Sequence, residues 1–466
     1  MRAQAPITKI FWFSLLLLFS GLRPVVAQTP VIIGKDNWLF FRPEMIQPAD
    51  EVAINTSLDL VERFNKVLSA NGTALAYAVV PLKMRIYADF LPERTKLTPY
   101  MVASYGRVTR VLKAKGVNVV DVNNALMKSK IRTSSTPIFF KGDTQMSQLG
   151  GMVVAEAIRD EILLNPRLKS AYDATPEEKY TMEFQKQLYT LKEGDLRSRL
   201  PANHPKYPPE QTLLFDIKRT NKVAMGSLNG SAMPEVVLVG SGYSQEWTLF
   251  SQALQYALQR DVLPFAVSGE KSPWVSLIET YVASDNFQNR PPKLLIWETP
   301  ERELAAPPNY EYREQRYRSD NTEWLLRVSA WVQRVCKASA VSATIAEVSL
   351  ASKTQNRVGD AISVAATAEA DFVEVRLSQP ITKQQYVSAR LTTKGSKLVV
   401  IDASGPDVAT RRFTLTVVGD ELEHNFKVPL PSLGAGYTML RLFPGQTDKF
   451  SIKQLAVCEQ PSDLLL

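Results

Sequence analysis

Histidine and cysteine are scarce in this chain, each occurring twice. His204 and His424 lie far apart in the sequence, which excludes the closely spaced histidine pairs of zinc enzymes. Cys336 and Cys458 are likewise too far apart for a Cys-x-x-Cys metal or redox motif. Glycine-rich phosphate loops and calcium-loop patterns are missing as well. We therefore predict neither a cofactor nor a metal centre.

Long apolar runs are absent beyond the N-terminus. There, basic residues precede the apolar run Ile10–Phe19, and a small-residue cleavage site ends at Ala27. This order predicts a secretory signal peptide over residues 1–27, cleaved on export. An uncleaved membrane tether is the alternative. The mature chain is expected to be soluble in an exported compartment.

The two cysteines predict one disulfide in an oxidising compartment. Pairing Cys336 with Cys458 closes a loop of 458 − 336 = 122 residues. The chain-entropy model predicts a stabilisation of roughly 4 to 5 kcal/mol for such a loop. Two unpaired, buried thiols are the alternative.

Charge gives no support for a nucleic-acid partner. The formal net charge is +8, of which three positive charges lie in the predicted signal peptide, leaving 8 − 3 = +5. Basic and acidic residues balance after residue 340, so the surplus lies in the first part of the chain. This mild surplus can accommodate an anionic polymer, but it lacks the dense basic stripe of a nucleic-acid-binding domain.

Helical and strand periods alternate up to Cys336. The expected helices are residues 55–70, 100–115, 148–164, 246–260, 273–283 and 323–335, and the expected strands are residues 73–80, 117–122, 235–239 and 293–297. Such alternation predicts an α/β domain with a mainly parallel sheet, which binds ligands at the carboxyl ends of its strands. Residues 165–232, rich in proline and charge, are predicted to form a lid or rim of the site.

After residue 342 the pattern changes to short alternating apolar runs separated by Gly, Pro, Asp and Lys. The expected strands are residues 344–350, 361–366, 372–377, 386–392, 397–401, 413–418, 424–428, 437–443 and 450–457. This pattern predicts an all-β sandwich or jelly roll over residues 342–466, after an α/β domain over residues 28–336.

One stretch, Val-Val-Leu-Val-Gly-Ser-Gly-Tyr-Ser over residues 236–244, has the form of a strand followed by a catalytic serine turn. Such a turn presents a serine hydroxyl over the sheet edge, beside backbone N–H groups that stabilise an oxyanion. A second stretch, Asp-Thr-Gln over residues 143–145, has the form of an Asp-x-His pair whose imidazole is missing.

At these residues the chain resembles the periplasmic alginate O-acetyltransferase family of AlgX and AlgJ, whose catalytic domain is similar to an SGNH hydrolase. The family pattern Val-Gly-Thr-Ser-Tyr-Ser aligns with residues 239–244, which puts the family nucleophile at Gly242. The family motif Asp-Thr-His-Trp aligns with residues 143–146, which puts the family base at Gln145.

Three further stretches carry the resemblance. Residues 34–40 are similar to the family's Gly-x-x-Gly-Trp-Leu-Phe element, residues 80–87 to its Val-Pro-x-Lys-x-x-Ile-Tyr segment, and residues 297–302 to its Trp-Glu-x-x-Glu-Arg element. The likeness covers nearly the whole mature chain. It implies a carbohydrate-binding module at residues 342–466, which favours AlgX over AlgJ.

The resemblance implies a periplasmic component of alginate or related exopolysaccharide biosynthesis and O-acetylation. Its implied partners are the anionic polymer and the periplasmic and membrane proteins of the acetylation and export machinery. In a serine–histidine–aspartate triad the hydroxyl attacks the acetyl carbonyl and the imidazole takes its proton. Gly242 and Gln145 can do neither, so the alternative is a catalytically inactive polysaccharide-binding or scaffold member.

Asp143, Ser241 and Ser244 are the remaining candidate catalytic residues, since a shift of the turn could present either serine. Asp143 is either a retained catalytic carboxylate or a helix N-cap. His204 is a candidate replacement base or an ordinary loop residue, whereas His424 is expected to be a surface or packing residue.

Candidate sugar contacts lie in both parts of the chain. In the turn the candidate is Tyr243, and Trp38, Trp247 and Trp297 are either stacking platforms or core residues. In the β module the candidate stacking rings are Tyr386 and Tyr437, and the basic side chains that could pair with uronate carboxylates are Lys394, Lys397, Arg411 and Arg412.

Overall fold

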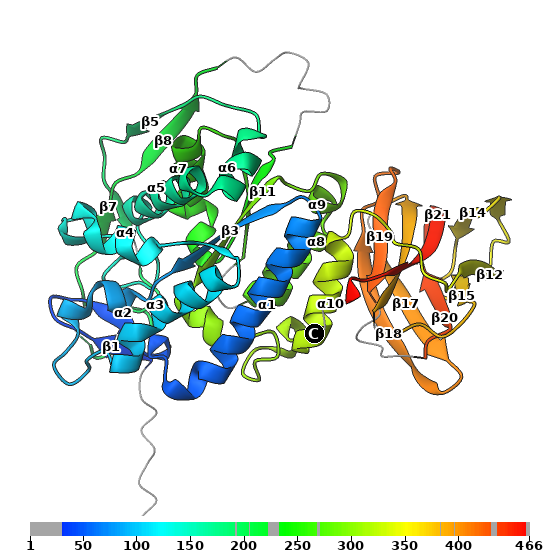
Figure 1. Cartoon of the computed structure of the whole chain (residues 1–466), viewed down its shortest axis with the longest axis horizontal. Coiled ribbons are helices and arrows are strands. Elements are labelled where there is room, and N and C mark those ends of the chain that lie inside the picture. Colours follow the sequence, from blue (N-terminus) through cyan, green and yellow to red (C-terminus); the bar gives the residue numbers. More distant parts are fainter. Residues whose placement is uncertain are drawn as a thin grey trace, which may run out of the picture.

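Two kinds of β-sheet divide the chain into two parts (Figure 1). The computed structural model describes residues 30–191, 193–204, 206–221, 233–267, 271–382, 384–395, 397–429 and 436–462. The predicted signal peptide lies outside the described residues. Within these residues, no helix is both long enough and apolar enough to cross a membrane.

A parallel sheet forms the centre of the first part. Its strands are β3 (Ala74–Val80), β4 (Asn118–Val120), β9 (Val236–Gly240), β10 (Val262–Ala266) and β11 (Leu294–Pro300). They pair in the order β10-β9-β11-β3-β4, all parallel. The three central strands are buried along their whole length, as expected of parallel strands that are covered on both faces.

Helices cover both faces of this sheet. They are α1 (Glu51–Ala70), α2 (Lys83–Ile86), α3 (Pro99–Ala114), α4 (Val122–Lys128), α5 (Gln148–Leu164), α6 (Pro166–Asp173), α7 (Phe250–Leu258), α8 (Thr280–Ala283), α9 (Asp285–Asn289) and α10 (Asn321–Val332). Because side chains alternate along a strand, Ala76 and Ala78 of β3 face a core with α4, α5 and α7, whereas Tyr77 and Val79 face a core with α1, α3 and α10.

Two antiparallel sheets form the second part. Their strands are β12 (Ala343–Ser349), β13 (Gln355–Val358), β14 (Ala361–Ala366), β15 (Phe372–Leu377), β16 (Gln385–Thr393), β17 (Lys397–Gly405), β18 (Val408–Val417), β19 (His424–Pro429), β20 (Met439–Phe443) and β21 (Thr447–Glu459). One sheet has the order β12-β15-β20-β17-β18 and the other the order β13-β14-β21-β16-β19. Val375, Leu391 and Ile401, from both sheets, share one core, which is the arrangement of a β-sandwich.

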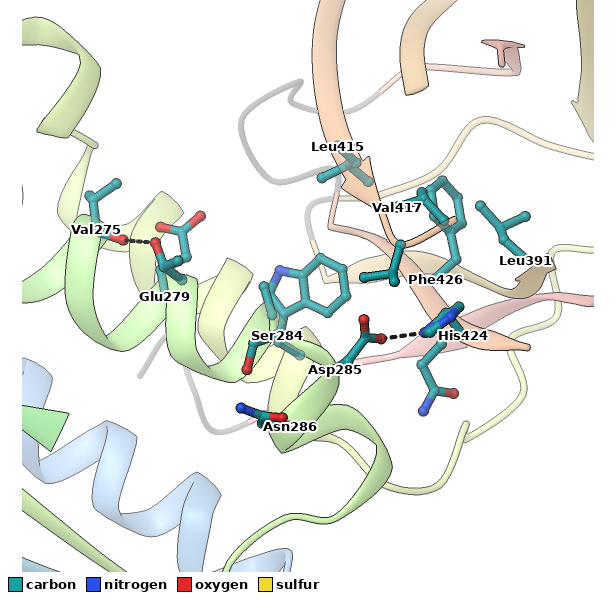
Figure 2. A pocket seen from close by; sticks show the side chains of 15 residues that line it. Val275, Glu279, Ser284, Asp285, Asn286, Leu391, Leu415, Val417, His424 and Phe426 are labelled. Atoms are coloured by element: carbon teal, nitrogen blue, oxygen red, sulfur yellow. Dashed lines mark hydrogen bonds and ion pairs between the residues drawn. The ribbon is translucent and has the colours of Figure 1, made fainter. Parts of the chain in front are cut away.

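Covalent and polar contacts join the two parts. A disulfide links Cys336, which follows α10, to Cys458 of β21, as predicted. Figure 2 shows Asp285 of α9 directed at His424 of β19, and the Asp285 Oδ1 atom lies 2.6 Å from His424 Nδ1. The sandwich therefore packs beside α9 and α10, as Figure 1 shows.

The predicted fold class, an α/β domain followed by a β-sandwich, is confirmed. The helix expected over residues 246–260 is broken into a 3-10 turn, η6 (Glu246–Thr248), and α7, because Leu249 between them has a φ of 56°. The helix expected over residues 273–283 is a π-helical segment, η7 (Pro273–Glu279), followed by α8. Strand β10 is absent from the expected elements because Pro264 weakens its pattern, and its place at the sheet edge tolerates a proline.

Short antiparallel pairs complete the first part. In the 165–232 segment, β5 (Tyr180–Phe184) pairs with β8 (Phe215–Arg219), and β6 (Tyr189–Leu191) pairs with β7 (Glu210–Thr212). Near the start of the described chain, β1 (Val31–Ile33) pairs with β2 (Leu39–Phe41). The three-residue strands β1, β2, β6 and β7 carry too few alternations to be predicted from periodicity.

Candidate functional site

The turn after β9 has the geometry expected of a nucleophile turn. Strand β9 ends at Gly240, and Ser241 then begins a single 3-10 turn, η5 (Gly242–Ser244). The Ser241 hydroxyl oxygen accepts a hydrogen bond from the Tyr243 N–H at 3.2 Å. The chain therefore leaves the sheet abruptly at its carboxyl edge, where parallel sheets bind ligands.

Gly242 and Gln145 face each other across this edge. A Cβ atom added at Gly242 would lie 2.7 Å from Gln145 Nε2. Gly242 offers no hydroxyl, and the carboxamide of Gln145 does not take up a proton at neutral pH. The Gln145 Oε1 atom is buried and has no hydrogen-bond partner among the described residues. The pair preserves the positions of a nucleophile and a base without their chemical groups.

Backbone N–H groups hold the Asp143 carboxylate. Its Oδ1 accepts from the Gln145 N–H at 2.9 Å, and its Oδ2 accepts from the Asp195 N–H at 3.1 Å. Burial, and then the nearby Asp195 carboxylate, raise the pKa of Asp143 to about 6. Helix α5 is capped by Ser147, whose hydroxyl accepts the Gly150 N–H at 3.1 Å, so the interpretation of Asp143 as an N-cap is wrong.

Ser241 and Ser244 direct their hydroxyls at Glu298, in the interior. Each Oγ lies 2.9 Å from Glu298 Oε2, and the Ser241 N–H donates to the same oxygen at 2.8 Å. Glu298 of β11 is fully buried, and burial raises its pKa to about 7 although these hydrogen bonds lower it. The two serines therefore act as donors to a buried carboxylate, and we call these three residues the Ser–Glu cluster.

Gly240 fits at the end of β9 only because glycine has no Cβ atom. A Cβ atom at Gly240 would lie 1.9 Å from Ser244 Oγ and 2.9 Å from Glu298 Oε2. Both side chains are buried and hydrogen-bonded to each other, so neither has room to move away. The end of β9 is thus shaped around the Ser–Glu cluster.

The structure places Tyr243 in the interior rather than at a ligand-facing surface. Its hydroxyl donates to the Thr144 carbonyl at 3.2 Å and accepts from Arg302 Nη1 at 3.3 Å. Arg302 also lies 3.3 Å from the buried Glu44. Tyr243 therefore connects the turn to the Asp143–Gln145 segment.

Lys83 joins three stretches that carry the family resemblance. Its ammonium group donates to the carbonyl oxygens of Leu39 at 2.6 Å, Lys141 at 2.9 Å and Asp143 at 2.8 Å. Lys83 is buried, and burial lowers its pKa to about 8. The sequence alone predicts no role for Lys83. The only sequence feature that points to this residue is its place in the Val-Pro-x-Lys stretch. It positions the backbone that carries Asp143.

A cavity of about 390 Å³ opens beside Gln145, and we call it the Gln145 cavity. Its described lining residues are Asp143, Gln145, Glu193, Gly194, Asp195, Ser198 and Trp247. Four of them belong to the 165–232 segment, which therefore forms a rim of the site as predicted. Trp247 is 40% exposed, whereas Trp38 and Trp297 are buried core residues. Neither Ser241 nor Ser244 is among the described lining residues.

Neither histidine is among the described residues that line the Gln145 cavity. His204 stacks on Tyr207 with ring centroids 5.3 Å apart, and it is not among the described lining residues. His424 bridges Asp285 and Asp420, at 2.6 Å and 2.7 Å. Within the described part of the chain, no group of three or more His, Cys, Asp or Glu residues is arranged to hold a metal ion.

The basic residues proposed as sugar contacts in the sandwich lie on different sheets. Lys394 follows β16, whereas Arg411 and Arg412 lie on β18 of the other sheet. Lys394 Nζ lies 3.6 Å from Asp448, and Arg412 makes two 2.7 Å contacts with Asp402. Arg411 and Arg412 are adjacent on a strand, so they point to opposite faces.

Neither tyrosine of the sandwich presents its ring to solvent. Tyr386 is 1% exposed and packs with Ala330 and Cys458 where the two parts meet, whereas Tyr437 is 4% exposed and lies in the sandwich core. The expectation that they act as open stacking platforms is wrong. The side chain of Lys397, a further proposed contact, lies outside the described residues.

Sequence comparisons identify related proteins. The family described as "SGNH hydrolase-like domain, acetyltransferase AlgX" matches residues 31–301. A probable alginate O-acetylase AlgJ of Pseudomonas fluorescens is 30% identical over 304 residues, which are 62% of this chain and 71% of the relative. An alginate biosynthesis protein AlgX of Pseudomonas syringae pv. tomato is 27% identical over 162 residues, which are 34% of this chain and 32% of the relative.

Solved structures share the fold. The O-acetyltransferase domain of Pseudomonas putida AlgJ matches with a TM-score of 0.52 and 24% identity, covering 64% of this chain and 98% of that one. Pseudomonas aeruginosa AlgX matches with a TM-score of 0.60 and 16% identity, covering 92% of this chain and 95% of that one. Since the family match spans more than half of the sequence, this chain belongs to the AlgX family of SGNH hydrolase-like acetyltransferase domains.

Proposed function

We propose that this chain takes part in the O-acetylation of alginate, or of a related exopolysaccharide, without carrying the acetyl group on a serine of the turn. The observation that carries the proposal is that Gly242 and Gln145 face each other as a nucleophile and a base would, yet hold neither group. Relatives named as probable alginate O-acetylases support the reaction and the polymer.

Acetyl transfer through a serine needs three groups at one place. A hydroxyl attacks the acetyl carbonyl, an imidazole takes its proton, and a carboxylate orients the imidazole. Loss of the nucleophile or the base lowers turnover on the order of a millionfold, because the triad acts as a unit. Of the three groups, Asp143 supplies the carboxylate, whereas Gly242 and Gln145 stand where the hydroxyl and the imidazole are needed.

The Ser–Glu cluster is a poor substitute for the missing nucleophile. Its hydroxyls point at Glu298, and neither serine is among the described residues lining the Gln145 cavity. A serine that turned toward an acetyl group would leave the buried carboxylate short of a donor, at a cost of about 1 to 3 kcal/mol. This geometry favours a role in shaping the turn.

The Gln145 cavity is better matched to sugar hydroxyls than to a uronate carboxylate. Asp143, Glu193 and Asp195 can accept hydrogen bonds from hydroxyl groups. The exposed Trp247 offers an aromatic face for a sugar ring. Three carboxylates at one cavity repel a fourth. We infer that the polymer presents its hydroxyls here while its carboxylates are held elsewhere.

The proposed location is the periplasm, reached by a signal peptide over residues 1–27. The disulfide between Cys336 and Cys458 supports an oxidising compartment. The proposed partners are the anionic polymer and the periplasmic and membrane proteins of the acetylation and export machinery. In this proposal residues 28–336 form the acetyltransferase-like domain and residues 342–466 a carbohydrate-binding-like module.

The acetyl content of the exopolysaccharide tests the proposal. Cells that lack the chain should make polymer with fewer acetyl groups, as measured by NMR of the purified polymer. Chains carrying Ser241→Ala or Ser244→Ala should restore the acetyl content as the wild type does, with exported protein quantified by immunoblot.

Two outcomes of this experiment would count against the proposal. Unchanged acetylation in cells without the chain would contradict a role in the reaction. Failure of a serine variant that is exported at the wild-type level would contradict the non-catalytic mechanism.

A further inference from the structure

A second cavity lies between the α/β part and the sandwich. Its volume is about 410 Å³, within the range of ligand pockets, about 300 to 1,000 Å³. One wall includes Arg334, after α10, and the other includes Arg390 of β16 and Lys427 of β19. We call it the basic cavity after these three residues. The Cys336–Cys458 disulfide links its two walls covalently.

The basic cavity lies at the amino edge of the parallel sheet. Pro291, which lines it, precedes β11. Arg334 Nη2 donates to Thr73 Oγ1 at 3.3 Å, and Thr73 immediately precedes β3. Both strands run from this edge toward the turn that contains Gly242. The basic cavity is therefore separate from the Gln145 cavity, which lies at the opposite edge.

Positive charge in the basic cavity is not balanced locally. None of its described lining residues is Asp or Glu. Lys427 is 7% exposed, and its Nζ donates to the carbonyl oxygens of Trp331 at 3.0 Å and Gln333 at 2.6 Å. An ammonium group has three N–H donors, so one remains for a ligand. Burial, and then the charge of Arg390, lower the pKa of Lys427 to about 7.

Other donors at the basic cavity also lack acceptors. The guanidinium group of Arg390 makes no hydrogen bond or ion pair with any described residue. The pKa of Glu423 is lowered first by its hydrogen bond to Lys453 and only in part by Arg390. The Gln333 Nε2 atom is buried without a partner among the described residues. Buried charge and unused donors together favour a bound anion.

The adjacent cavity drawn in Figure 2 has a different character. It has a volume of about 630 Å³ and is lined by Glu279, Asp285 and apolar side chains such as Phe426. It shares Trp331 and Asn425 with the basic cavity. The carboxylates of Glu279 and Asp285 in its lining disfavour an anion there, whereas the basic cavity has no described carboxylate in its lining.

We propose that the basic cavity binds the carboxylate of an anionic sugar residue, a uronate. Guanidinium groups match the two oxygens of a carboxylate, and the Lys427 ammonium adds a third cation. The choice of a uronate over another anion rests on the proposed function, in which polymer carboxylates are excluded from the acidic Gln145 cavity. Because the disulfide holds the two walls together, the donors are in place before the ligand arrives.

Calorimetric titration of the purified full-length mature protein with oligouronates tests this site. Arg334→Gln combined with Arg390→Gln should weaken binding at least about tenfold, because each removed cation takes charge-assisted hydrogen bonds with it. The matched control, Lys113→Gln combined with Lys128→Gln, removes two exposed charges from the first part and should bind as the wild type does.

Proton uptake gives a readout that is specific to Lys427. A bound carboxylate stabilises the charged ammonium, so at neutral pH the wild type should take up protons on binding. Titration in buffers of different ionisation enthalpy measures this uptake. Lys427→Met should bind without the uptake, and equal uptake in both proteins would overturn the role of Lys427.

The remaining outcomes separate this proposal from the proposed function. Unchanged affinity in the arginine variant would overturn the basic cavity and leave the proposed function intact. No binding of oligouronates by the wild type would overturn both. A neutral oligosaccharide of the same length should not compete, and displacement of the oligouronate by an equal concentration of inorganic phosphate would overturn the assignment of a uronate.

Discussion

Glu298→Gln should change how the stability of the protein depends on pH. Glu298 is fully buried and accepts hydrogen bonds from the Ser241 and Ser244 hydroxyls. Glutamine has nearly the same shape, keeps an acceptor oxygen for these donors and removes the ionisable group. The substitution therefore isolates the energetic effect of a buried carboxyl group.

The expected size of the change in the free energy of unfolding follows from the pKa of Glu298. Burial raises the pKa of Glu298 from its ordinary value of 4.5 to about 7. The folded protein thus binds this proton more tightly than the unfolded chain does. The resulting stabilisation is fully present below the unfolded pKa and is lost as pH rises through about 7. At about 1.4 kcal/mol per pH unit, the loss amounts to about 3 kcal/mol.

Denaturant unfolding from about pH 4 to about pH 8 measures the effect. Across this range the free energy of unfolding of the wild type should fall by about 3 kcal/mol more than that of Glu298→Gln. Asp143, whose pKa is about 6, is common to both proteins, so its contribution drops out of the difference. The exposed Glu156→Gln serves as the control and should follow the wild type. Parallel curves for the wild type and Glu298→Gln would refute the reasoning.

Further predictions concern the turn and the disulfide. The double variant with Gly242→Ser and Gln145→His should hydrolyse a chromogenic acetyl ester roughly a thousandfold or more faster than the wild type. If the double variant were no faster than either single variant, the facing geometry of the two positions would be contradicted. Replacing Cys336 and Cys458 by serine releases a 122-residue loop, so the free energy of unfolding should fall by up to about 5 kcal/mol in denaturant titrations. An unchanged free energy of unfolding would contradict this prediction. Gly240→Ala should destabilise by about 1 to 3 kcal/mol or more, because its Cβ would lie 1.9 Å from a buried serine hydroxyl oxygen, and an unaltered melting temperature would disprove this.

Most of the fold can be predicted from local patterns in the sequence. Helix α5 begins and ends where its apolar period predicts, because that feature is local. The apolar run of β3, and the apolar first half of β11 up to Trp297, predict buried parallel strands for the same reason. The alignment of Gly242 and Gln145 with one family site is likewise readable from two short motifs.

The orientation of the side chains at the candidate site cannot be predicted from local sequence patterns. The acceptor for Ser241 is Glu298, 57 residues later and on a different strand, and only the packing of β9 against β11 brings the two together. Likewise, His424 meets Asp285 across 139 residues, at the contact between the two parts. Alternation along a strand also leaves open which face is buried, so Tyr386 could be mistaken for an exposed ring.

The central claim of the proposed function is that neither serine of the turn after β9 acts as a nucleophile. The most direct test is to assay the purified mature wild type, Ser241→Ala and Ser244→Ala for acetyl-ester hydrolysis and for acetyl transfer to oligouronates. We predict that none of the three exceeds the buffer blank, while the wild type binds oligouronates. Turnover by the wild type that either alanine substitution abolishes would contradict this conclusion.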